Sequence, residues 1–162
     1  VGARWQDVAD HIAQRLDDQV LPFLDLQYLY GLARAARPQA QTLLHHIERR
    51  GAAAPTRHHA ADTIWRQVAV PAAHGLLAHA QGRYAEAVDT LGQALPRLLQ
   101  IGGSHAQRDL FEQIHLDALM RAGHWGAAQQ LLQPRCNQQP HSLRLRRLVQ
   151  RSYSMLGLAV SA

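Results

Sequence analysis

The sequence predicts an all-α fold, an α-solenoid of antiparallel helical hairpins with about 8 helices, and two observations carry this prediction. Residues that favour helices, alanine and leucine above all, are abundant, whereas valine, isoleucine and threonine together make only 17 of 162 residues. A helical hydrophobic periodicity runs nearly from end to end and is interrupted at a few proline and glycine positions. With 47% hydrophobic and 18% charged residues, the chain can bury a core without metal or disulfide crosslinks.

The individual helices are expected between successive breaks. They cover roughly 3–19, a stretch from near Pro22, a stretch from Pro38 to near Gly51, and 58–81. Residues 52–56 predict a loop, because a proline disfavours helical geometry at the residue before it. We expect the long stretch to be kinked or divided at Pro71, which suits the first position of a new helix.

Three stretches of the sequence are related, and each is typical of a helix end, a tight turn and a helix start. They begin at Leu32, Leu77 and Leu119. The last two resemble tetratricopeptide repeats in the spacing of Gly75, Gly82, Tyr84, Ala87, Leu91 and Ala94, and of Gly123, Trp125, Ala128, Leu132 and Pro140. The alternative is a chance match in an alanine- and leucine-rich helical bundle. The first stretch lacks a turn glycine and has Pro38 at the aromatic position.

The repeat positions have physical roles. Gly82 and Gly123 are expected in the turns because glycine adopts left-handed backbone conformations without steric cost. Ala87 and Ala128 are small enough for two antiparallel helices to approach closely. We expect the aromatic residues two positions after each turn glycine, Tyr84 and Trp125, to fill the space beneath the next hairpin.

A closer resemblance covers residues 68–151. The segments VAVPAAHGLLAHAQGRYAEAVDTL, LPRLLQIGGSHAQRDLFEQ and LLQPRCNQQPHSLRLRRLVQR look like the tetratricopeptide repeat protein 38 family, and IGGSHAQRDLFEQ is the most specific part. The segment FLDLQYLYGLARA at 23–35 is similar to an earlier part of those proteins. The resemblance implies a helical-hairpin fold and no established reaction. It also implies further hairpins ahead of Val1, which agrees with the missing initiator methionine and favours a C-terminal fragment.

We therefore expect a single tetratricopeptide-like domain over residues 1–162, with hairpins near 22–51, 71–100 and 104–138 and a capping helix at 141–158. In that last helix Leu145, Leu148, Val149 and Leu156 suit one side, and Arg144, Arg147 and Arg151 suit another. Terminal repeats need a polar outer face, which arginine provides.

The basic residues are unevenly placed. All 17 are arginine, for which an alanine- and arginine-rich genome is the simplest explanation, and no acidic residue follows Asp117. Residues 118–162 therefore carry the whole positive excess, which could attract an acidic partner, an anionic surface or nucleic acid. Nucleic acid is the less favoured reading because few aromatics are interleaved with the arginines. The single cysteine, Cys136, and the absence of a long apolar run favour a cytoplasmic protein outside the membrane.

We find no signature of an enzyme, a cofactor or a metal site. Adjacent histidines such as His45 and His46, or His58 and His59, diverge by about 100° on a helix and are interpreted as surface residues. Ser104 does not lie in a nucleophile elbow, Cys136 has no base at a telling distance and is interpreted as a packing thiol, and no phosphate-binding glycine loop occurs.

The leading hypothesis is a non-catalytic interaction module that holds a protein or peptide on a concave face. Their positions in the repeats and their polarity predict that the following residues lie on this face: Leu76, His79, His105, Arg108, Gln113, Asp117 and Arg121. A capping box formed by Ser104 and Gln107 could alone explain the SHAQRD segment. In the alternative interpretation, His105, Arg108 and Asp109 bind an anion or help to form a ligand-binding or enzymatic pocket of a longer protein. Anion binding by the arginine-rich end and self-association through an uncovered first hairpin remain open.

Overall fold

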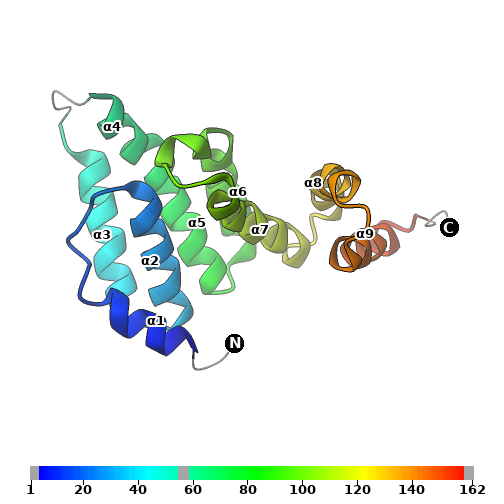
Figure 1. The fold of residues 1–162 in the computed structure, drawn as a ribbon, viewed down its shortest axis with the longest axis horizontal. Coiled ribbons are helices and arrows are strands. Elements are labelled where there is room, and N and C mark those ends of the chain that lie inside the picture. Colours follow the sequence, from blue (N-terminus) through cyan, green and yellow to red (C-terminus); the bar gives the residue numbers. More distant parts are fainter. Residues whose placement is uncertain (1–3, 55–58, 159–162) are drawn as a thin grey trace. The chain divides into compact units, whose positions relative to one another are not determined.

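The computed structural model describes residues 4–54 and 59–158 of the chain (Figure 1). It is 79% helical, and no strand occurs in these ranges, which confirms the all-α prediction. The elements in chain order are α1 (Arg4–Ile12), α2 (Pro22–Arg34), α3 (Gln39–Ala52), α4 (His59–Ile64), the π-helical turn η1 (Trp65–Ala69), α5 (Val70–Ala80), α6 (Tyr84–Ala94), the 3-10 helix η2 (Leu95–Ile101), α7 (His105–Arg121), α8 (Trp125–Gln138) and α9 (Leu143–Met155).

The chain divides into two compact units, Val1–His115 and Leu116–Ala162. In the first unit α2 packs against α3 and α5 packs against α6, which corresponds to the first two expected hairpins. The third expected hairpin corresponds to α7 and α8, which a short turn joins, and α9 packs against α8 within the second unit.

The first helix is shorter than its periodicity predicts. It ends at Ile12 rather than near residue 19, and residues 13–21 lead through turns to Pro22. Leu16 continues the apolar spacing and packs against the core, although it lies outside the helix. The partial burial of this leucine within a turn therefore gives the same apolar spacing in the sequence as one more turn of helix.

The break expected at Pro71 is confirmed. Before it, the backbone widens into η1, where the Val70 N–H donates to the carbonyl of Trp65 five residues back. Because proline has no N–H and its ring crowds the preceding turn, a local change of helical pitch lets the chain continue past it. Of the loop expected at 52–56, residue 52 instead ends α3, residues 53 and 54 are non-helical, and residues 55 and 56 lie outside the described residues.

The core of the first unit joins distant parts of the chain. Its fully buried large side chains come from seven elements and include Leu26, Leu29, Leu32, Leu43, Ile47, Val68, Leu76, Leu91, Ile101 and Phe111. The rings of Phe23 on α2 and Phe111 on α7 meet edge to face with centroids 6.2 Å apart. A Cβ at Gly103 would lie 2.9 Å from the Phe23 ring, so the turn before α7 sits directly against α2.

Three interhelical turns share one hydrogen-bond pattern. In each, an N–H donates to the carbonyl five residues back: Arg37 to Leu32, Arg83 to Ala78 and His124 to Leu119, at 3.0, 2.9 and 2.8 Å. The preceding residue has positive φ, 79° at Gly82 and 81° at Gly123, which is the left-handed conformation expected for both glycines. In the first turn Ala36 holds this place with φ 54°. The first hairpin thus forms the same turn without glycine.

The second unit buries small and apolar residues between α8 and α9. Ala128 and Leu132 on α8 are fully buried, and Leu145 on α9 is 9% exposed. Ser142 caps α9, as its side chain accepts the Leu145 N–H at 3.4 Å. Leu156 lies just beyond the helix and is 39% exposed, so it does not join the apolar side expected for it.

Candidate binding residues

Leu76 and His79 on α5 lie inside the first unit. Leu76 is fully buried and His79 is 6% exposed. The His79 ring packs against Tyr84 at a centroid distance of 5.6 Å, and its Nδ1 lies 3.2 Å from the Tyr30 hydroxyl. This corrects the expectation that both residues project onto an open face, because α2 and α6 cover the side of α5 that carries them.

An aromatic chain extends from that histidine to α1. The ring of Trp5 meets Tyr30 edge to face, with centroids 6.1 Å apart. The Arg34 guanidinium lies 5.8 Å above the Trp5 ring. The amide of Gln6 donates to the carbonyl of Ala35 at 3.1 Å, which satisfies one of the carbonyls at the end of α2. These contacts hold α1 against α2. The ring contact of Tyr84 is with His79 of its own hairpin, whereas the sequence predicts that Tyr84 packs beneath the next hairpin.

The SHAQRD turn forms the predicted capping box. The Ser104 N–H donates to Gln107 Oε1 at 2.8 Å, and the Gln107 N–H donates to Ser104 Oγ at 3.3 Å. The Arg108 guanidinium donates to the carbonyls of Gly102 and Gly103. His105 is exposed. The polar groups of this turn therefore largely serve the start of α7, which weakens the interpretation as an anion or ligand site.

Polar residues recur every four positions along α7. The Gln113 amide donates to the carboxylate of Asp109, and Arg121 Nε donates to Asp117 at 2.7 Å. The Asp117 and Arg121 side chains are 37% and 55% exposed. Like His105 and Arg108, these two residues and Gln113 combine polar groups with access to solvent, whereas Leu76 and His79 do not.

The remaining repeat positions have structural surroundings. Ala87 and Ala128 are fully buried, as close helix packing requires. The Arg151 guanidinium of α9 lies 5.4 Å above the Trp125 ring, so this aromatic contacts the next helix. Pro140 is exposed between α8 and α9, and its carbonyl accepts Arg146 Nε at 2.7 Å.

Several histidines are more buried than their spacing in the sequence predicts. His46 binds the carbonyl of Leu16 at 3.1 Å, and its side chain is only 15% exposed. His115 on α7 is 8% exposed, and burial lowers its pKa below the ordinary value. The interpretation as surface residues is therefore wrong for these two and for His79. The pair His58 and His59 cannot be judged, because the side chain of His59 and all of His58 lie outside the described residues.

No group of three or more histidine, cysteine or acidic side chains in the described part of the chain is placed to hold a metal ion. On α3, Glu48 lies 3.9 Å from His45 one turn earlier on the same helix, and it also lies 3.0 Å from His74 on α5. Only the contact with His74 joins two helices, and all three side chains are substantially exposed. Cys136 on α8 is a free, partly buried thiol.

A buried carboxylate on α2 gives no signal in the sequence. Asp25 is 2% exposed, and its Oδ2 has no hydrogen-bond partner. Burial, with repulsion from Asp18, raises the pKa of Asp25 to about 6, while the nearby His46 acts in the opposite direction. In the sequence, Asp25 looks like an ordinary aspartate in the first turn of a helix. It is distinguished only in the fold, where α3 and the segment before α2 pack around it.

A second buried carboxylate is paired. Asp62 on α4 is 1% exposed and binds the Arg50 guanidinium of α3 at 2.7 Å.

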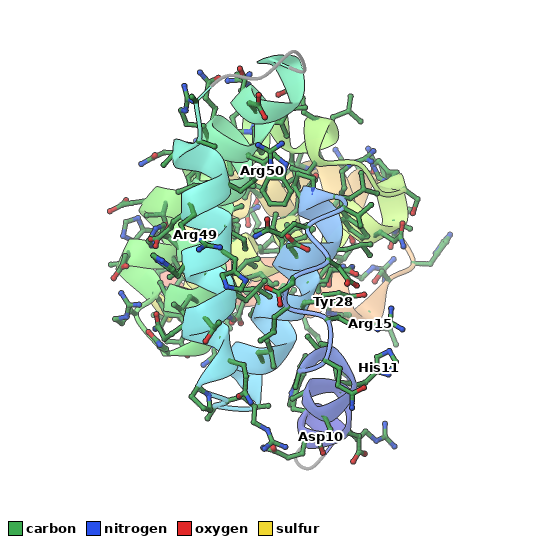
Figure 2. The ribbon with its side chains drawn as sticks, turned by 90° about the vertical axis from the view of Figure 1, so that its left-hand side faces the viewer. Asp10, His11, Arg15, Tyr28, Arg49 and Arg50 are labelled. Atoms are coloured by element: carbon green, nitrogen blue, oxygen red, sulfur yellow. The ribbon has the colours of Figure 1, made fainter. Side chains whose placement is uncertain are left out.

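In Figure 2 Arg49 and Arg50 project from α3, and Asp10 and His11 project from α1. Arg49 is exposed, unlike its neighbour. Asp10 forms an ion pair with Arg37 that joins α1 to the turn after α2.

Comparison with known proteins gives the chain no family. No protein-family model matches it, and no solved structure matches it. The helices of the described ranges are all too short or too polar to span a bilayer. The structure by itself defines the class of the protein, which is an all-α protein of packed helical pairs.

Proposed function

We propose that the chain is a non-catalytic interaction module built from tetratricopeptide-like hairpins, and that Gln113, Asp117 and Arg121 belong to its partner-binding face. The observation that carries the proposal is the recurrence of one turn geometry at Ala36, Gly82 and Gly123. Repeated helical pairs joined in this way stack side by side, and stacked pairs leave extended surfaces that bind proteins or peptides.

Close helix packing within the middle hairpin also supports the proposal. Gly75 lies against the backbone of Leu91, and the fully buried Ala87 occupies the adjoining turn of α6. Small residues at these positions bring the two helices together in the manner of a tetratricopeptide hairpin. A relation to the tetratricopeptide repeat protein 38 family and a cytoplasmic location belong to the same proposal, resting on the sequence segments and on the single cysteine.

The three α7 residues are suited to recognition because they offer an amide, a carboxylate and a guanidinium at intervals of four. Arg121 is more than half exposed, and exchange of its surface ion pair for one with a partner costs little free energy. A ligand pocket at SHAQRD has less support, since Arg108 already donates to two backbone carbonyls.

Affinity capture with the full chain and the triple variant Gln113→Ala, Asp117→Ala, Arg121→Ala tests the assignment. We expect loss of captured partner with unchanged helical circular dichroism. The matched control is Arg83→Ala with Glu86→Ala, which removes another half-exposed ion pair from a helix surface. Equal capture by the triple variant would contradict the α7 face, and the absence of any specific partner for the unmodified chain would contradict the interaction module.

A further inference from the structure

One side of α9 carries an exposed column of four residues at intervals of four. It consists of Leu143, Arg147, Arg151 and Met155, and it is named the α9 column below. Leu143 and Met155 are 67% and 56% exposed. On a helix, residues four apart lie one above the other, so two guanidinium groups are flanked by an apolar side chain at each end over about 18 Å.

The charge of this column is not balanced within its unit. From Leu116 onward the sequence holds six arginines and one acidic residue, Asp117, and Asp117 already binds Arg121. Arg147 and Arg151 are four apart on one helix, a spacing at which like charges repel. Arg151 is held in place by the Trp125 ring below it, which reduces the conformational entropy lost when a partner binds.

We propose that the α9 column binds an acidic amphipathic helix of a partner protein. Carboxylates of the partner would pair with Arg147 and Arg151, and its apolar residues would cover Leu143 and Met155. Arginine and methionine are both enriched in protein interfaces. The alternatives leave part of the column unused: a phosphate backbone would pair with the arginines but would leave Leu143 and Met155 in water.

A second copy of this chain matches the column less well. Residues 1–115 contain 11 arginines and 11 acidic residues, so they offer no acidic surplus, and residues 116–162 are themselves basic. The column lies on a different helix from Gln113 and Asp117, so a variant of either set tests one proposal alone.

The probe is a fluorescein-labelled 18-residue helical peptide with leucines and glutamates in the order Leu, Glu, Glu, Leu at intervals of four. Its affinity for the full chain is measured by fluorescence anisotropy at 50, 150 and 500 mM NaCl. We expect binding that weakens as salt rises, because the ion pairs are exposed and are screened. A peptide with glutamine for glutamate and a peptide with serine for leucine should each bind at least about fivefold more weakly.

The variant Arg147→Gln with Arg151→Gln should lower the affinity roughly tenfold. The matched control is Arg15→Gln with Arg49→Gln, which makes the same change in net charge at exposed arginines of the first unit (Figure 2). The control should bind within about twofold of the unmodified chain. Circular dichroism checks that both variants keep their helical content.

Three outcomes would overturn the proposal. These are equal binding of the glutamine peptide, equal loss of affinity in the control, and tighter binding of a labelled single-stranded oligothymidine than of the acidic peptide. The last would assign the column to nucleic acid. Retained peptide binding by the Gln113, Asp117 and Arg121 variant is expected and separates this surface from the one on α7.

Discussion

The backbone of Leu91 on α6 lies so close to Gly75 on α5 that a methyl group at Gly75 would be 2.7 Å from the Leu91 Cβ and 2.8 Å from its amide nitrogen. Non-bonded Cβ atoms do not approach other atoms so closely, and backbone cannot rotate away as a side-chain tip can. The absence of a side chain at residue 75 therefore sets the distance between the two helices of the middle hairpin.

Gly75→Ala should destabilise the chain by about 1–3 kcal/mol, because α5 and α6 must move apart to admit the methyl group. This loss exceeds the gain in helix propensity of up to about 1 kcal/mol. Denaturant unfolding of both proteins measures the difference. Gly126→Ala is the control, since a Cβ there meets nothing within 4 Å. Gly126→Ala should stabilise the chain, and a neutral Gly75→Ala would refute the close approach.

Two of the interhelical turns allow a pair of substitutions that should change stability in opposite directions. Gly82→Ala should cost about 1–2 kcal/mol, because it places a side chain at φ 79°. Ala36→Gly should have the opposite sign, since Ala36 already holds φ 54° in the equivalent turn of the first hairpin. Thermal unfolding of the two variants is the measurement. Changes of the same sign would contradict a shared left-handed geometry.

Much of the helical layout could be predicted because its signals are local. Proline fixes the start of α2 and the break before α5 through its missing N–H, and the Ser104 and Gln107 pair specifies the start of α7. The early end of α1 could not be predicted, since Leu16 packs against the core from a turn while keeping the helical spacing of the preceding apolar residues. The tight turn after Leu32 was predicted, but the left-handed conformation of Ala36 within it was not, because alanine alone disfavours that conformation.

The candidate site was less predictable, because it depends on contacts between distant segments. Leu76 and His79 occupy repeat positions that usually face a partner, yet α2 supplies Tyr30 to cover the histidine 49 residues away in sequence. Periodicity identifies the sides of a helix and does not say which neighbour covers each side. On α7, Arg121 is exposed and Gln113 and Asp117 are partly exposed, and the role of these residues in binding stays a prediction.

The buried carboxylate of Asp25 should make stability depend on pH. Its pKa is about 6 in the folded chain and 3.8 ordinarily, so between these values the folded state holds a proton that the unfolded state has lost. The free energy of unfolding contributed by this group therefore falls as pH rises from about 4 to 6. Above this window the ionised, buried carboxylate costs of the order of 3 kcal/mol.

Asp25→Asn should remove this dependence while keeping the side-chain shape. Any cost of the buried amide is the same at every pH, so the informative quantity is the difference between the two proteins across the pH range. We expect the variant to gain stability relative to the unmodified chain between pH 4 and 7, measured by urea unfolding at each pH. Asp89→Asn, at an exposed aspartate of α6, controls for the change in net charge. A difference that stays constant with pH would show that Asp25 titrates as an ordinary carboxylate and is not desolvated in the fold.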